Sequence, residues 1–218
     1  MALRKATEVT RIKRRQRDEA ARSRILDAAE VEFGEAGFEN ARMHAIADRA
    51  RLALGTMYGL FEGKHDLYEA IHARRLEELF SSVGAVVIEA ERPIEAIELG
   101  VRSIVRFFAE RPHYLAMHLR DGFAWSSAES MRTQVQRDSW GRGFEMMRAF
   151  FASAAADGSV RAGDAELDAR LAIAMQQVFM ARWLESSPRS SADELHQAIW
   201  TTLSRTFGIN ETGTEERR

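Results

Sequence analysis

Glu69 and His72 stand three residues apart, a spacing that places both side chains on one face of a helix. Helical bundles that hold two iron ions use pairs of this type, together with further glutamates from facing helices. We interpret this pair as part of a solvated helix face, and we expect neither a metal ion nor a cofactor.

Other side chains that could support catalysis do not form a recognisable set. The chain has no cysteine, which excludes a thiol nucleophile and disulfides. Neither a Ser-His-Asp order nor a glycine-rich phosphate loop stands out. An enzyme is therefore the rejected rival class, and a protein that binds partners is expected.

Basic side chains gather at the amino terminus. Residues 1–17 hold seven lysines and arginines against Glu8 alone, a net charge of +6 that leaves −8 for the rest of a chain with net charge −2. A basic arm on an acidic body indicates a polyanion partner at one end of the protein. A disordered, solubilising tail is the alternative.

The segment "ALGTMYGLF", residues 53–61, combines a helical apolar pattern with two glycines, Gly55 and Gly59. A glycine inside a helix costs about 1 kcal/mol relative to alanine, so two of them need a reason. One reason is a backbone that must approach a partner closely. The alternative is a loop-like connector with Tyr58 as an ordinary surface residue.

Helices are expected to carry most of these side chains. Only three prolines occur, and apolar residues recur at helical spacing. No run of about 18 apolar residues and no signal peptide is recognised, so a cytoplasmic protein without a membrane span is expected. The pattern predicts nine helices and no strand, at about 18–36, 43–49, 53–61, 64–90, 93–110, 112–121, 127–157, 164–185 and 192–207.

Residues 24–50, "RILDAAEVEFGEAGFENARMHAIADRA", and 54–71, "LGTMYGLFEGKHDLYEAI", resemble the DNA-binding domain of the tetracycline-repressor (TetR) family. The resemblance implies an all-α fold, with a three-helix helix-turn-helix DNA-binding domain and a larger six-helix domain for ligand binding and dimerisation. We accordingly predict a flexible basic arm, a helix-turn-helix domain, a C-terminal domain and a polar tail, at residues 1–17, 18–66, 67–208 and 209–218.

The resemblance also implies which residues contact DNA. In a helix-turn-helix the second helix of the motif lies in the major groove, and here that helix is the segment 53–61. Tyr58 and Lys64 would contact phosphates, and Thr56 a base edge. The predicted DNA-binding residues are Arg42, Met43, His44, Arg51, Ala53, Leu54, Gly55, Thr56, Tyr58, Gly59 and Lys64.

The sequence departs from the family pattern at the turn before that helix. Where the family has a glycine, an apolar residue and a serine, this chain has Arg51, Leu52 and Ala53. Arg51 is strained if its φ is positive, and Ala53 cannot act as a side-chain cap, a loss of about 1 kcal/mol. Because the recognition face is poor in hydrogen-bonding side chains, we expect reliance on phosphate contacts and DNA shape.

The same resemblance implies a ligand pocket among the middle helices and a dimer built through the last two helices. Aromatic and methionine side chains suit an apolar or aromatic ligand, although such a stripe also suits a plain core. The predicted ligand-binding residues are Phe107, Tyr114, Met117, His118, Trp125, Trp140, Phe144, Met147, Met175 and Phe179. The predicted dimer residues are Leu171, Val178, Arg182, Trp183, Leu195, Ile199 and Leu203.

Together these expectations describe a ligand-responsive transcriptional regulator. Such a repressor would bind a palindromic double-stranded DNA operator as a homodimer, and a small apolar or aromatic effector would release it. The alternative is a helix-turn-helix scaffold that acts mainly through protein–protein interaction or non-specific DNA binding, because a fold does not fix a function.

Overall fold

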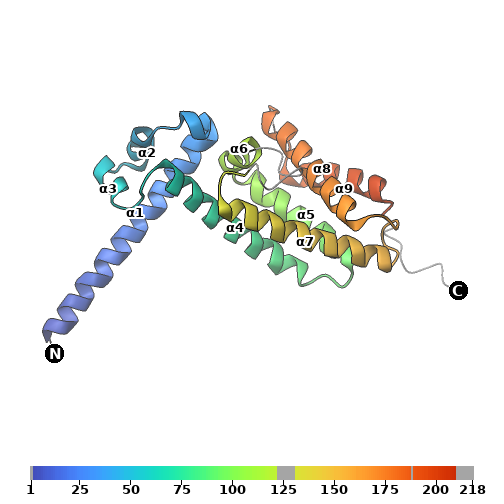
Figure 1. The fold of residues 1–218 in the computed structure, drawn as a ribbon, viewed down its shortest axis with the longest axis horizontal. Coiled ribbons are helices and arrows are strands. Elements are labelled where there is room, and N and C mark those ends of the chain that lie inside the picture. The colour runs from blue at the N-terminus through green and yellow to red at the C-terminus, as the bar shows by residue number, and fades with distance from the viewer. Residues whose placement is uncertain (1, 122–130, 188, 210–218) are drawn as a thin grey trace. The chain divides into compact units, whose positions relative to one another are not determined.

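Helices make up almost all of the part of the chain that the computed structural model describes, residues 2–121, 131–187 and 189–209 (Figure 1). No strand occurs among these residues, so the predicted all-α class is confirmed. The helices are α1 (Ala2–Asn40), α2 (Met43–Ala50), α3 (Leu54–Tyr58), α4 (Lys64–Val87), α5 (Pro93–Ala109), α6 (Pro112–Arg120), α7 (Gln134–Ala156), α8 (Ala165–Glu185) and α9 (Ala192–Phe207).

The chain divides into two compact units, Met1–His72 and Ala73–Arg218. The point of division lies inside α4, as does the boundary that the sequence predicts after residue 66. The predicted polar tail, residues 209–218, lies outside the described residues except for Ile209.

The first helix differs from the flexible arm expected at residues 1–17, because α1 runs through this segment from Ala2. The segment contains neither glycine nor proline and is rich in alanine, lysine and arginine, which favour helix. Residues 11–20 are all exposed. The amino-terminal half of α1 extends beyond α2 and α3 (Figure 1), and its residues 11–20 form a solvated stretch of helix.

Aromatic packing builds the core of the first unit. The ring of Tyr68 meets Phe33 and Phe38 edge-on, with 5.0 Å between centroids in each pair. Gly37, where the sequence predicts a helix stop, has a φ of 78° that breaks the helical backbone inside α1. After this break the ring of Phe38 stacks on that of Phe33, with 5.9 Å between the ring centroids.

His72 belongs to this core, so the interpretation of Glu69 and His72 as a solvated face is wrong for the histidine. Its side chain is fully buried, and its ring lies 4.7 Å from that of Tyr68. Glu69 is half-buried. Within the described ranges, no group of three or more His, Cys, Asp or Glu side chains is placed to hold a metal ion.

The second unit is a bundle in which α5 packs against α6, α7 and α9, while α8 packs against α6, α7 and α9. Local signals set the helix starts. Pro93 and Pro112 occupy first turns, and Asp164 and Ser191 cap α8 and α9 by accepting backbone N–H bonds. No helix in the described part has the length and apolar character to cross a membrane.

Candidate functional site

The short helix α3 presents its small residues to solvent. Ala53, Gly55, Thr56 and Gly59 are exposed, and 51% of Tyr58 is exposed. On the opposite side Met57 is fully buried, and Phe61 is 2% exposed just beyond the helix. The structure thus brings the predicted recognition residues onto one accessible surface, with Leu54 half-buried at its edge.

Gly55 has no internal reason to be glycine. A Cβ built at this position meets no atom within 4 Å, and the backbone is helical. At Gly59 an added Cβ lies 3.4 Å from the carbonyl oxygen of Thr56, an ordinary contact. Since alanine is favoured in helices by about 1 kcal/mol, the two glycines point to an external constraint, such as a surface pressed against this helix.

In the turn between α2 and α3, Arg51 adopts a positive φ, which the sequence indicates as a source of backbone strain. Arg51 has a φ of 53° and a ψ of 47°, in the left-handed region, and its backbone N–H bonds to the carbonyl of Asp48 at 3.0 Å. The guanidinium of Arg24 donates to the carbonyls of Ala50 and Arg51. Arg24 thereby satisfies carbonyl groups that the end of α2 leaves unpaired. Ala53 precedes α3 without a side-chain cap.

Arg51→Gly should therefore stabilise the fold. Left-handed backbone costs a non-glycine residue roughly 1–2 kcal/mol, so we expect the free energy of unfolding to rise by about 1 kcal/mol in urea denaturation. Arg49→Gly, two residues earlier in α2, is the control and should destabilise the protein by a similar amount. Equal destabilisation by both variants would contradict the strain at Arg51.

Three predicted residues mark the start of α2. Arg42 is the extended residue before the helix and has no side-chain cap bond, while its backbone N–H donates to Glu32 Oε1 at 3.3 Å. Arg42 and His44 are exposed, and Met43 is half-buried. Both exposed side chains are thus accessible to a partner at the amino-terminal end of α2.

The ammonium group of Lys64, which the sequence predicts to contact a phosphate, is bonded within the protein. Its ammonium donates to the carbonyl of Glu39 at 3.0 Å and lies 4.9 Å from the centroid of Phe38. It therefore supports the carboxyl-terminal end of α1, and a phosphate would have to compete with that carbonyl. A role for Lys64 in DNA contact stays a prediction, and its replacement is expected to weaken the fold as well.

Arginines of α1 continue the surface of α3. Arg22 donates from Nη1 to the carbonyl of Leu60 at 3.2 Å, and its guanidinium lies 4.3 Å from the Phe61 ring centroid. Arg11, Arg14 and Arg15 line a shallow groove together with Arg22 and Leu60. Within it Arg14 forms an ion pair of 3.8 Å with Asp18. We name Arg11, Arg14 and Arg15 the arginine row, which sequence reasoning placed on a flexible arm.

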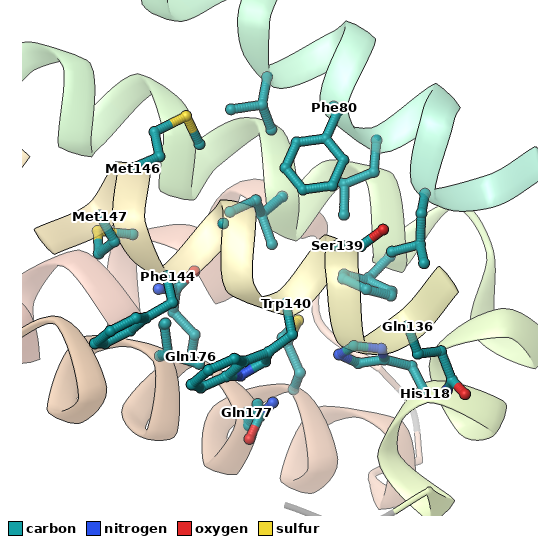
Figure 2. A pocket seen from close by; sticks show the side chains of 18 of the residues that line it. Phe80, His118, Gln136, Ser139, Trp140, Phe144, Met146, Met147, Gln176 and Gln177 are labelled. Atoms are coloured by element: carbon teal, nitrogen blue, oxygen red, sulfur yellow. The ribbon is translucent and has the colours of Figure 1, made fainter. Parts of the chain in front are cut away.

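A cavity of about 160 Å³ lies among the helices of the second unit (Figure 2). Its wall is mostly apolar, with Leu76, Phe80 and Val83 from α4 and Ile104 and Phe108 from α5. The polar and titratable wall residues are His118, Asp121, Gln136, Ser139, Trp140, Gln176 and Gln177. This composition is typical of a site for a small apolar molecule with a few polar groups.

The predicted pocket residues fall into two sets. His118, Trp140, Phe144 and Met147 line the cavity. The other described residues of the prediction, Phe107, Tyr114, Met117, Met175 and Phe179, do not line it. Phe107, Tyr114 and Met117 are at most 4% exposed and pack in the core of α5 and α6. Trp125 lies outside the described residues.

The register of α8 explains why Met175 and Phe179 do not line the cavity. Ile173, Gln176, Gln177 and Met180 follow the three-and-four spacing of one helix face and form the wall instead. Adjacent amides in an otherwise apolar run were the signal for this face. The prediction from sequence placed no ligand-binding residue on α4, which contributes Leu76, Phe80 and Val83 to the wall.

The outer side of α8 leaves a stripe of apolar side chains uncovered. Leu167, Leu171 and Val178 are 53%, 42% and 58% exposed, and Arg182 is exposed one turn further on. Their spacing places them on one helix face. Leu171, Val178 and Arg182 thus remain predicted dimer residues.

The other predicted dimer residues are buried within the chain itself. Leu195, Ile199 and Leu203 of α9 are at most 5% exposed. Trp183 is 8% exposed and donates from Nε1 to the carbonyl of Ser190 at 2.8 Å. The apolar stripe of α9 faces the core of the unit, where burial and the positive charge of Arg102 lower the pKa of His196.

Comparisons with known proteins agree with this architecture. Residues 25–71, which include α2, α3 and the turn between them, match the model of "Bacterial regulatory proteins, tetR family". The HTH-type transcriptional repressor KstR of Mycobacterium tuberculosis (strain ATCC 25618 / H37Rv) is 30% identical over 117 residues, 53% of each chain. The chain spans about half the length of the curated relatives it matches.

Two solved structures share the fold over most of the chain. The ketosteroid transcriptional regulator KstR2 of Mycobacterium tuberculosis has a TM-score of 0.72 at 18% identity, covering 87% of this chain and 95% of that one. AibR, solved in complex with isovaleryl coenzyme A and operator DNA, has a TM-score of 0.70 at 15% identity, covering 87% and 100%. KstR is named a transcriptional repressor and KstR2 a transcriptional regulator. The helix-turn-helix region of this chain, residues 25–71, thus matches the tetR family of bacterial regulatory proteins.

Proposed function

We propose that the protein is a ligand-responsive transcriptional repressor that binds a palindromic operator. The observation that carries this proposal is the surface of α3, where exposed small residues surround Tyr58 and Gly55 has no internal reason to be glycine. Such a helix can lie deep in the major groove, while the arginine row offers contacts to phosphates beyond it. KstR is named a repressor, and AibR is bound to operator DNA. This role belongs in the cytoplasm.

A second copy of the chain is the partner that this function requires. A palindromic operator presents two half-sites related by a two-fold axis, so two protein copies with the same symmetry fit it. The exposed stripe Leu167, Leu171 and Val178 gives each copy an apolar surface for an isologous contact. Burial of such side chains supplies most of the free energy of association.

The cavity of the second unit is the proposed effector site. Its apolar wall suits an apolar or aromatic molecule, and it involves α4, the helix in which the two units divide. An effector that binds better to the DNA-free conformation would lower operator affinity by its difference in affinity for the two states. AibR, which shares the fold, was solved with isovaleryl coenzyme A and operator DNA bound.

Gly55→Ala should separate folding from DNA binding. The added methyl group enters open space and improves helix propensity, so the free energy of unfolding should rise by about 0.5–1 kcal/mol. Affinity for operator DNA should fall by roughly tenfold or more, since a displaced helix loses contacts worth about 1–3 kcal/mol each. Denaturation and fluorescence anisotropy measure the two effects.

The matched control for this variant is Gly84→Ala in α4, where an added Cβ also meets nothing within 4 Å. It should stabilise the protein without altering DNA affinity. Unchanged affinity in Gly55→Ala would remove the argument that α3 is pressed against DNA.

One alternative remains supported by a specific observation. Thr56 and Tyr58 are the hydrogen-bonding side chains on the exposed side of α3, a small set for reading bases. A scaffold that binds proteins, or DNA without sequence preference, would have the same feature. A salt titration of duplex binding separates the protein-binding role, because contacts with phosphates give a steep loss of affinity with salt. A flat or absent dependence would refute the DNA-binding proposal.

A further inference from the structure

Two polar atoms at the cavity wall have no hydrogen-bond partner among the described residues. They are Nε1 of Trp140 on α7, a donor, and Oε1 of Gln177 on α8, an acceptor. Both atoms are shielded from solvent, and Gln177 is only 5% exposed. A buried donor or acceptor without a partner is destabilising, so the pair calls for a ligand that supplies both missing bonds.

Three other polar side chains of the wall, Gln136, Asp121 and Gln176, are bonded within the protein. Gln136 accepts bonds from Thr133 and donates to Asp121 Oδ2 at 2.6 Å, and Asp121 also pairs with Arg132 at 3.1 Å. The amide nitrogen of Gln176 donates to the carbonyl of Ala172 at 3.1 Å. Among the described wall residues, Trp140 Nε1 on α7 and Gln177 Oε1 on α8 therefore remain buried without a hydrogen-bond partner.

The indole of Trp140 is held in place by its neighbours. Its ring stacks on Phe144 with 5.1 Å between centroids and an angle of 5°. The guanidinium of Arg170 lies 4.6 Å from the Phe144 ring and 5.7 Å from that of Trp140. Figure 2 shows Trp140 reaching from α7 toward α8, where Gln176 and Gln177 project. The donor is therefore fixed on the side of the cavity that the amide of Gln177 borders.

The charge of the wall residues and the volume of the cavity limit which ligands can bind. Among the described residues that line the cavity there is no lysine or arginine, and Asp121 contributes a carboxylate. A ligand carboxylate would therefore lose its hydration without gaining a cationic partner. The volume of about 160 Å³ is close to that of an engineered apolar cavity, about 150 Å³, which accommodates benzene.

We propose that the cavity selects a small uncharged aromatic or alicyclic alcohol. The Trp140 Nε1–H donates to the hydroxyl oxygen, and the hydroxyl donates its own hydrogen to Gln177 Oε1, while the hydrocarbon part fills the apolar wall. A hydroxyl is the smallest group that accepts and donates at one atom. This assignment rests on the proposed role of the cavity as the effector site.

The test compares three probes on the full chain without DNA: benzyl alcohol, toluene and benzoate. Titrations are followed by the indole N–H resonances of the four tryptophans, with Trp140 assigned from Trp140→Phe. Benzyl alcohol should shift the Trp140 resonance and bind roughly tenfold more tightly than toluene, the ratio expected for one net hydrogen bond. Benzoate should not bind. Equal affinity for alcohol and hydrocarbon, preference for benzoate, or no binding of benzyl alcohol would overturn the proposal.

Variants assign the preference to the two side chains. Gln177→Leu should remove the advantage of benzyl alcohol over toluene, whereas Gln134→Leu, an exposed position on α7 that does not line the cavity, should retain it. An unchanged ratio in Gln177→Leu would overturn the role of that acceptor, and the wild-type ratio decides the alcohol preference independently of how the variants fold. Selective binding of the alcohol without any effect on DNA affinity would instead count against the effector role alone.

Discussion

Val178→Asp is expected to split the protein into monomers and to remove its high affinity for operator DNA. Val178 is 58% exposed on the uncovered stripe of α8. In a two-fold interface the substitution acts twice, and each copy loses apolar burial worth about 1.5–3 kcal/mol and gains a carboxylate without a partner. The dimer dissociation constant should rise by at least roughly a hundredfold, measured by sedimentation equilibrium over a range of protein concentrations.

Ile88→Asp is the control for this substitution. Ile88 is 85% exposed just beyond α4, away from the α8 stripe. The control should remain dimeric with wild-type DNA affinity. A Val178→Asp protein that dimerises as tightly as the wild type would place the subunit contact on another surface.

Replacing Arg11, Arg14 and Arg15 by glutamine is expected to have the second large effect. Glutamine keeps helix propensity close to that of arginine, so α1 should persist while three positive charges per protomer are lost. Each lost phosphate contact reduces the slope of log affinity against log salt by about 0.9. Six contacts per dimer would reduce it by about five, with an affinity loss on the order of a thousandfold at low salt.

A charge-matched control removes three exposed arginines of the second unit, Arg102, Arg106 and Arg205. The net charge changes equally, so a general electrostatic effect would appear in both proteins. We expect the steep salt dependence to be retained in the control. If both triple variants show the wild-type slope, the arginine row does not contact DNA.

The helices could be read from sequence because local signals determine them. Apolar spacing, first-turn prolines and the caps of α8 and α9 act within a few residues, and the predicted bounds agree closely for α5, α6, α8 and α9. The exposed side of α3 was also predictable, because burial of Met57 and Phe61 determines which side of this helix faces solvent.

Features that depend on packing between helices could not be read in the same way. His72 looks like a surface residue until Tyr68 brings its ring into the core. Apolar residues such as Leu195 fit a dimer surface and a monomer core equally well in sequence. Spacing alone also cannot tell which face of α8 borders the cavity, and so Met175 was preferred over Gln176.

Selection of bound sequences from random DNA duplexes tests most directly whether α3 reads an operator. With the wild-type protein at moderate salt, the enriched duplexes should contain an inverted repeat whose half-sites lie about one helical turn, or a multiple of it, apart. Loss of that enrichment is expected in Val178→Asp, which presents a single half-site reader. Recovery of duplexes without any shared repeat from the wild-type protein would contradict sequence-specific recognition through α3.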